Sequence, residues 1–208
     1  MSPLSLALLG ALVIPLFVAT WRMSLFGLAL QGLIMAALAY PGLQPMSSAE
    51  SWLSIFDLAL VRGLLAPLAL YTVLRAQGAP SRNDVISANL FSWTLALGTV
   101  LAGFNFSEAL VSEAGEQQTL VAVAVAGFLL GFLVLANATT PFSQMTAVLR
   151  IENSIALLEL SGGQHSPFGL QLGMLAIFVA TIGFFRWYLA TLETSEGQLE
   201  AAPDSLTL

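Results

Sequence analysis

The sequence predicts an all-α fold, a polytopic bundle of about seven transmembrane helices, with six as the alternative count. Of its 208 residues, 57% are hydrophobic and only 9% are charged, and the mean hydropathy is +0.86. Apolar stretches also recur at about the 20-residue length that crosses the hydrocarbon core of a bilayer. Soluble domains carry roughly 25% charged residues, so this composition excludes a typical water-soluble enzyme. We expect a multi-pass protein in a lipid bilayer.

Six apolar stretches are long enough to be spans. The first does not resemble a signal peptide, because no Lys or Arg precedes it and Trp21-Arg22 follows it. We expect one transmembrane domain over residues 1–192 and a flexible acidic tail over 193–208. The six stretches cover residues 3–20, 23–40, 52–74, 87–106, 119–139 and 168–192.

A seventh segment, residues 141–163, is ambiguous because it holds three charged residues within one helix length. If it crosses the membrane, the outside connections contain no Arg, and the positive-inside rule places the N-terminus outside and the C-terminus inside. With six spans, Arg186 moves to the outside. A second alternative makes this segment an amphipathic helix lying in the membrane interface. In the seven-span topology the inside Arg residues are Arg22, Arg75, Arg82, Arg150 and Arg186.

Several kinds of chemistry are excluded or disfavoured by residue counts. The chain has no Cys, so it has neither disulfides nor thiolate metal ligands. The single His, His165, cannot supply a histidine-based metal site alone, and we expect it in a loop. The net charge of −6 disfavours a nucleic-acid partner. We therefore expect no metal, no cofactor and no nucleic acid.

Four charged residues fall at membrane depth: Asp57, Arg62, Glu152 and Glu159. Each charge costs about 2.5–3.5 kcal/mol at a helix centre on insertion scales, so it needs a partner or a water-filled path. These residues are therefore the candidate site for proton or ion transfer.

Arg62 lies near the membrane midplane, about 15 Å into its predicted span at 1.5 Å per residue. Asp57 is five residues earlier, which turns an α-helix by about 140°, so we do not expect a simple pair within the helix. Asp57 is then either a functional acid or an interfacial one, and Arg62 either a functional cation or half of a structural ion pair with another helix. Pro67, one turn further on, is expected to free a carbonyl and bend the helix.

Glu152 lies near the middle of residues 141–163. Glu159 follows seven positions later, which returns it to within about 20° of the same face, whereas Arg150 points to the opposite side. Similar depth suggests an ion pair between Glu152 and Arg62 on different helices. A carboxylate balanced between burial and a nearby Arg can take up and release a proton near neutral pH. The alternative is that the pair only fixes helix packing.

Close helix packing is suggested by a second pattern, Gly127-Phe-Leu-Leu-Gly131. Glycines four positions apart let another helix approach the backbone. The pattern is short and common in membrane helices, so it indicates contact without identifying the partner helix.

Two segments resemble the hydrogenase-4 component E family. Residues 127–160 are similar to that family's GHFLLGL-type helix, a short connection and a helix marked by a MENG-like motif, here Ile151-Glu152-Asn153-Ser154. Residues 60–68 are similar to the family's Lys-x-Leu-Leu-x-Pro-Leu helix, with Arg62 in the position of the basic residue. The overall length and the positions of the spans also match, so the resemblance covers most of the chain.

The resemblance implies a membrane subunit related in its C-terminal part to the K subunit of respiratory complex I. Such subunits lie beside antiporter-like subunits in hydrogenase and formate-hydrogenlyase complexes of the bacterial cytoplasmic (inner) membrane. Glu152 would be the intramembrane glutamate, Arg62 its basic partner, and Asn153 a motif residue beside it. The chain departs from the pattern at Ser154, where the family has Gly, and at Leu175, where the family can carry an acid. Either Glu159 replaces that acid, or the chain has lost a complete relay.

Three functions follow as alternatives. The first is a non-catalytic subunit of a hydrogenase-like or complex I-like assembly that contributes buried Glu and Arg to proton or cation translocation. The second is a scaffold that docks antiporter-like subunits through its apolar helices and Gly127 and Gly131. The third is a stand-alone small transporter, which the absence of an inverted repeat disfavours.

Overall fold

The computed structural model describes residues 2–18, 20–43, 49–76, 90–111, 115–138, 140–162 and 167–200. In these ranges the regular structure is helical, and no strand is present. Arg82 and His165 lie outside the described residues. The elements are α1 (Pro3–Phe17), α2 (Trp21–Ala39), the short 3₁₀ helix η1 (Tyr40–Leu43), α3 (Ala49–Ile55), the π-helix η2 (Phe56–Leu65), α4 (Ala66–Ala76), α5 (Leu90–Leu110), α6 (Glu116–Asn137), α7 (Pro141–Ser161) and α8 (Phe168–Glu200).

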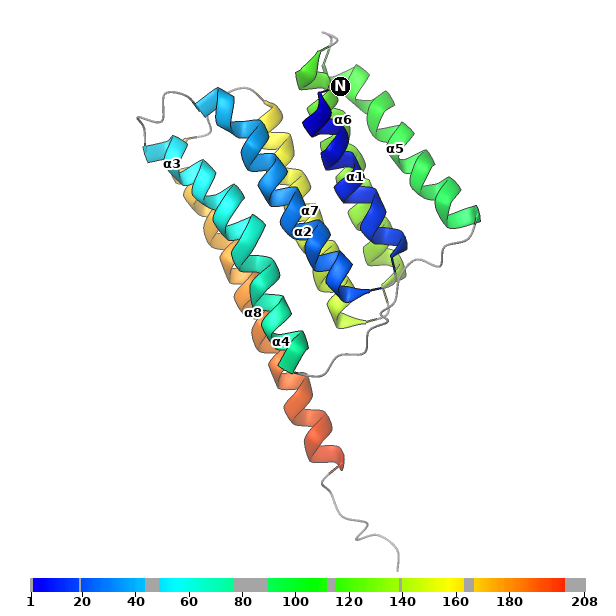
Figure 1. The fold of residues 1–208 in the computed structure, drawn as a ribbon, viewed down its shortest axis with the longest axis vertical. Helices are drawn as coiled ribbons and strands as arrows, with labels where there is room; N and C mark the ends of the chain where they lie inside the picture. Colours follow the sequence, from blue (N-terminus) through cyan, green and yellow to red (C-terminus); the bar gives the residue numbers. More distant parts are fainter. Residues whose placement is uncertain are drawn as a thin grey trace, which may run out of the picture.

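The helices run alternately down and up, with the N-terminus at the upper end of the bundle in Figure 1. The elements α3, η2 and α4 follow one another as a single long rod. The strongest packing is between α6 and α7, and α5 covers another side of α6. On the other side of the bundle, α2 packs against η2, and α4 packs against α8. These neighbours place η2, α7 and α8 around a shared interior.

Among the described residues, five helices are long and apolar enough to cross a membrane, as expected of a multi-pass membrane protein. They cover Trp21–Ala39, Ala49–Arg75, Leu90–Leu110, Glu116–Asn137 and Phe168–Thr191. The segment Pro3–Val13 is a shorter apolar helix. The prediction of an all-helical bundle of apolar helices is confirmed for the described residues. The backbone of α8 continues as helix to Glu200, beyond the expected start of the tail at 193, and residues 201–208 lie outside the described part.

Helix α7 is not among the five, because its charged residues lower its hydropathy, yet it lies inside the bundle. Buried residues occur along its whole length, from Phe142 to Ser161. This burial contradicts the alternative of an amphipathic helix on the surface. Its polar groups are enclosed by neighbouring helices, so the segment does not need the apolar composition of a helix that faces lipid.

The two glycines of the Gly127/Gly131 pattern form the contact between α6 and α7. A Cβ atom at position 127 would lie 2.6 Å from Oγ of Ser154, and one at position 131 would lie 2.5 Å from Cγ1 of Ile151. The predicted close approach is confirmed, and the partner is a helix of the same chain. These two glycines are therefore covered and do not form a docking surface for another subunit.

A second close approach joins α2 to η2. A Cβ atom on Gly32 would lie 2.5 Å from the backbone nitrogen of Gly63. The obstacle is main chain, which cannot rotate aside as a flexible side chain can. Glycine at position 32 therefore lets η2 lie directly on α2, immediately beside Arg62.

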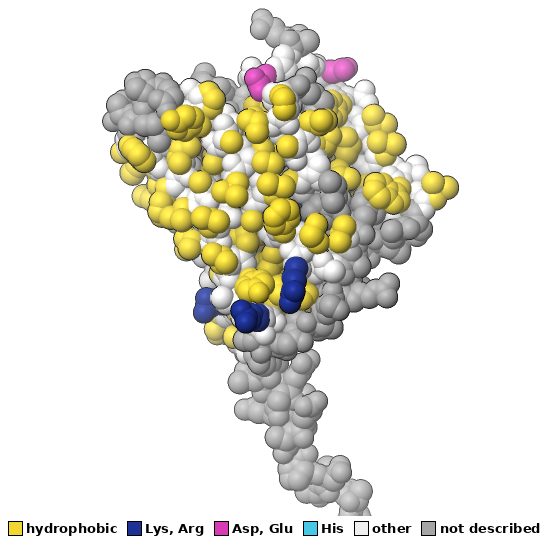
Figure 2. Space-filling model, in the orientation of Figure 1, with side chains coloured by type: hydrophobic (Ala, Val, Ile, Leu, Met, Phe, Trp, Pro, Cys, Tyr) yellow, Lys and Arg dark blue, Asp and Glu magenta, His cyan; other side chains and the backbone are white. Residues whose placement is uncertain are grey.

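The outer surface has an apolar middle and ends of opposite charge. In Figure 2 hydrophobic side chains cover the body of the bundle, Arg side chains lie near the lower end, and acidic side chains lie at the upper end. Arg22 is exposed at the start of α2 and Arg75 near the end of α4, whereas Glu108 and Glu116 are exposed near the ends of α5 and α6 that meet. This distribution is that of a membrane helix bundle with water-facing ends.

Candidate functional site

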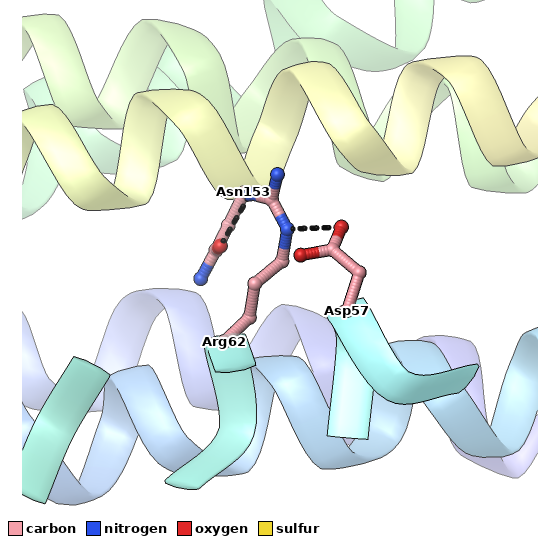
Figure 3. A network of polar contacts seen from close by, with 3 residues as sticks. All are labelled: Asp57, Arg62 and Asn153. Atoms are coloured by element: carbon pink, nitrogen blue, oxygen red, sulfur yellow. Dashed lines mark hydrogen bonds and ion pairs between the residues drawn. The ribbon is translucent and has the colours of Figure 1, made fainter. Parts of the chain in front are cut away.

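A network of polar side chains, here called the central polar cluster, lies between α2, η2 and α7. It consists of Gln31, Asp57, Arg62 and Asn153. Arg62 is only 2% exposed. Its Nε donates to Oδ2 of Asp57 at 2.9 Å, and its Nη1 donates to Oδ1 of Asn153 at 3.1 Å. Figure 3 shows the Arg62 side chain reaching from η2 toward α7, with both bonds drawn. One guanidinium thus joins two helices.

The Asp57–Arg62 pair forms within one helix, contrary to the sequence-based expectation. That expectation assumed α-helical geometry, in which positions five apart diverge by about 140°. The ten-residue segment Phe56–Leu65 is instead a π-helix, whose hydrogen bonds join residues five apart. The N–H of Ala66 bonds to the carbonyl of Val61 in this manner. The wider turn brings the side chains of Asp57 and Arg62 together.

Gln31 of α2 is part of the cluster, although sequence analysis did not identify it. It is buried, its Nε2 donates to the carbonyl of Ala11 at 3.4 Å, and its Oε1 accepts from Nδ2 of Asn153 at 3.5 Å. The amide nitrogen of Asn153 is thereby occupied, which leaves its oxygen for Arg62. The sequence feature that could have identified Gln31 is that it is the only side-chain amide within the apolar stretch 23–40.

Helix α8 contributes an aromatic face to Arg62. The guanidinium carbon lies 4.1 Å from the ring centroid of Phe178, within the range of a cation–π contact. Leu175, one turn earlier, packs against the hydrophobic cluster that contains Phe178 and Leu149. Leu175, where the sequence departs from the pattern of the family it resembles, is therefore part of an apolar contact here.

Glu152, the residue before Asn153 in α7, forms no ion pair with the described residues. Its Oε1 accepts from Oγ1 of Thr181 at 3.0 Å, while its buried Oε2 has no hydrogen-bond partner among the described residues. Arg62 is close enough to interact with it electrostatically. The expected Glu152–Arg62 ion pair is wrong, because within the described residues Arg62 pairs with Asp57 and bonds to Asn153.

Arg150 confirms one expectation and corrects another. It points away from Glu152, toward α1, where its Nη1 donates to the carbonyl of Leu12 at 3.4 Å. Its assignment to the inside end of a helix is wrong, because it is 4% exposed and lies in the middle of α7. The helix extends well beyond it on both sides, so it does not mark a membrane boundary.

The remaining predicted residues lie at the edge of the site. Glu159 is in the last turn of α7 and is partly exposed. Pro67 is the second residue of α4, directly after η2. Proline has no N–H, so it cannot donate to the carbonyl of Arg62 in the π pattern. The carbonyl that Pro67 leaves without this donor is therefore that of Arg62, whose side chain holds the central polar cluster together. The predicted bend of the helix stays a prediction.

Neither a metal centre nor a match to a known protein accompanies this site. Within the described ranges no group of three or more His, Cys, Asp or Glu residues could hold a metal ion. No family model, curated protein or solved structure matches the chain.

Proposed function

We propose that this protein is a non-catalytic membrane subunit of a bacterial hydrogenase-like or complex I-like assembly, and that Glu152 transfers protons or cations with the help of Arg62 and Asp57. The observation that carries the proposal is the state of Glu152. It is held at one oxygen by Thr181, its other oxygen is buried and unpaired, and it lies within electrostatic reach of Arg62. An ionisable group inside a membrane bundle is a candidate for transfer.

The different contacts of the two carboxylates, Asp57 and Glu152, support this role. Asp57 neutralises Arg62 through a short contact, so Glu152 is not held in an ion pair of its own. A buried carboxylate near a cation that another acid binds is suited to reversible proton binding. The resemblance of Ile151-Glu152-Asn153-Ser154 and of residues 60–68 to the hydrogenase-4 component E family points to the same residues.

We also propose a topology of seven spans, with the N-terminus outside and the C-terminus inside the bacterial inner membrane. Helices α1 and α7 would join the five apolar helices. The alternation of helix directions and the grouping of exposed Arg at one end support this topology. Antiporter-like subunits are the proposed partners.

The test is transport by the assembled complex carrying Glu152→Gln, which removes the titratable group and keeps the shape. We expect assembly to be intact and proton or cation movement to fall at least tenfold. Glu108→Gln is the matched control, because it changes an exposed acid at the end of α5. Unchanged transport by assembled Glu152→Gln would contradict the proposal.

The second candidate is a scaffold, favoured by the large apolar surfaces of α5 and α8. Only 22% and 6% of their apolar windows, respectively, are buried inside the chain. A scaffold predicts that Arg62→Ala removes the complex from the membrane and that whatever assembles transports normally. Purification in mild detergent separates both candidates from a stand-alone transporter, which would not bring stoichiometric partners.

A further inference from the structure

The contact between Asp57 and Arg62 depends on the hydrogen-bond pattern of the helix that carries them. In η2 the carbonyl of Val61 accepts from the N–H of Ala66. In an α-helix it would accept from Leu65, and Asp57 would point about 140° away from Arg62. A change from the π to the α pattern would therefore separate this pair and would also turn α4 relative to α3, because the two patterns differ in residues per turn.

Two features flank η2 where it meets α4 and α2. Pro67 lacks an N–H, so it cannot bond to the carbonyl of Arg62 or of Gly63 in either pattern. On the α2 side, Gly32 meets the backbone of Gly63 with no side chain between them. Leu58 and Val61 of η2 also pack with Ile34 and Leu28 of α2 in the two hydrophobic clusters, so a change of helix pattern requires repacking at this contact. Segments of π-helix are rare and occur frequently at functional sites.

A second carboxylate, that of Glu152, belongs to the residue next to Asn153, which Arg62 binds. The Nη1 of Arg62 is bonded to Asn153, which directly follows Glu152 in α7. Arg62 already interacts electrostatically with Glu152, and Oε2 of Glu152 has no partner among the described residues. Arg62 thus has one carboxylate that it binds and another that is available.

We propose that η2 switches between the π and the α pattern, and that this switch transfers Arg62 from Asp57 to Glu152. The inference rests on the proposed function and gives it a mechanism. In the π state Asp57 neutralises Arg62, and Glu152 keeps its proton. In the α state Asp57 turns away and Arg62 pairs with Glu152. The O–H bond of the Glu152 carboxyl then breaks, and the proton passes to water or to an acceptor on a neighbouring subunit.

The charged side chains near Glu152 come from two elements. The helix η2 presents Asp57 and Arg62, and α7 itself carries Arg150, which points toward α1, and Glu159, two turns away. Helix α8 faces Glu152 with the hydroxyl of Thr181. Among these described groups, Arg62 is the cation placed to change partner.

The test uses the full chain in phosphatidylethanolamine–phosphatidylglycerol vesicles and the variant Asp57→Asn. Solid-state NMR on labelled protein measures the distance from Nη of Arg62 to Cδ of Glu152, the hydrogen bond from Ala66 to Val61, and the carboxyl shift of Glu152. In the variant we expect Arg62 in ion-pair contact with Glu152, loss of the Val61–Ala66 bond, and an ionised Glu152. Glu108→Gln should leave all three signals as in the unaltered chain.

A titration of the unaltered chain provides a second measurement that does not depend on the folding of the variant. As pH rises, ionisation of Glu152 and loss of the Val61–Ala66 bond should share one midpoint. Separate midpoints overturn the proposal, and so does an Asp57→Asn protein in which Arg62 reaches Glu152 while the π bond persists. These NMR measurements involve no transport, so they test the switch separately from the proposed function. If Glu152→Gln loses transport but Asp57→Asn gives the same NMR signals as the unaltered chain, the proposed function stands and the switch is rejected.

Discussion

Asp57 and Arg62 lie five positions apart in one helix and form an ion pair of 2.9 Å because the helix between them is a π-helix. Arg62 is 2% exposed and Asp57 17% exposed, so this pair places a compensated charge inside an apolar bundle. The other bonds of Arg62, to Asn153 and over Phe178, extend from it to α7 and α8. The pair is therefore the structural centre of the candidate site.

Removing only one member of this pair should be costly. Asp57→Ala leaves a buried guanidinium uncompensated, and breaking a buried ion pair in this manner costs about 3–5 kcal/mol. The double variant Asp57→Ala/Arg62→Met should recover most of the loss, because an apolar replacement of both charges is close to neutral. Unfolding in mild detergent measures both variants. A double variant as unstable as the single one would show that Arg62 stabilises the fold independently of Asp57.

The contact between α2 and η2 predicts a severe effect of a single methyl group. Gly32→Ala places a Cβ 2.5 Å from the backbone of Gly63, and overpacking of this type costs roughly 1–3 kcal/mol. Gly98→Ala is the control, because no atom lies within 4 Å of its added Cβ. The midpoint of thermal unfolding should fall for position 32 and should stay the same or rise for position 98, because Ala favours the helix more than Gly does. Equal midpoints would mean that η2 does not rest on α2.

Gln31 should matter for the orientation of Asn153. Gln31→Leu leaves the amide nitrogen of Asn153 and the carbonyl of Ala11 without their bonds, which costs about 1–3 kcal/mol for each buried group left unpaired. The exposed residue Gln117 offers a matched control in Gln117→Leu. If both variants unfold at the same denaturant concentration, the Gln31 contacts contribute nothing to stability.

Thr181 should affect Glu152 without affecting the ion pair. Thr181→Val keeps the shape and removes the hydroxyl that donates to Oε1 of Glu152. In the assembled complex we expect slower proton or cation movement, at least twofold, because the carboxylate loses its anchor, while assembly is retained. Thr99→Val is the control, since Thr99 is on α5 and bonds only to the carbonyl of Leu95 in the described contacts. A transport rate equal to that of the control would remove Thr181 from the mechanism.

Composition and residue spacing were sufficient to predict the helical membrane bundle. Transfer into a bilayer depends on the apolar content of about 20 consecutive residues, which is a local property of the sequence. The expectation that Arg62 and Glu152 lie at membrane depth came from the same counting. The Gly127/Gly131 pattern predicted close packing, because a residue without a side chain lets any neighbouring helix approach its backbone. The sequence did not identify α7 as the helix that packs against these glycines, because a glycine face can accept any complementary helix.

The tertiary structure decided the pairing of the charges. An α-helical wheel separates Asp57 from Arg62, and only the π geometry of Phe56–Leu65 brings them together. Gln31 and Phe178 joined the site because α2 and α8 pack beside η2 and α7, a relationship between distant segments that no local pattern encodes. Hydropathy is a sum over neighbours in the chain, whereas an ion pair depends on angles and distances between side chains. The chain's composition thus determined the environment, and packing determined which carboxylate holds Arg62.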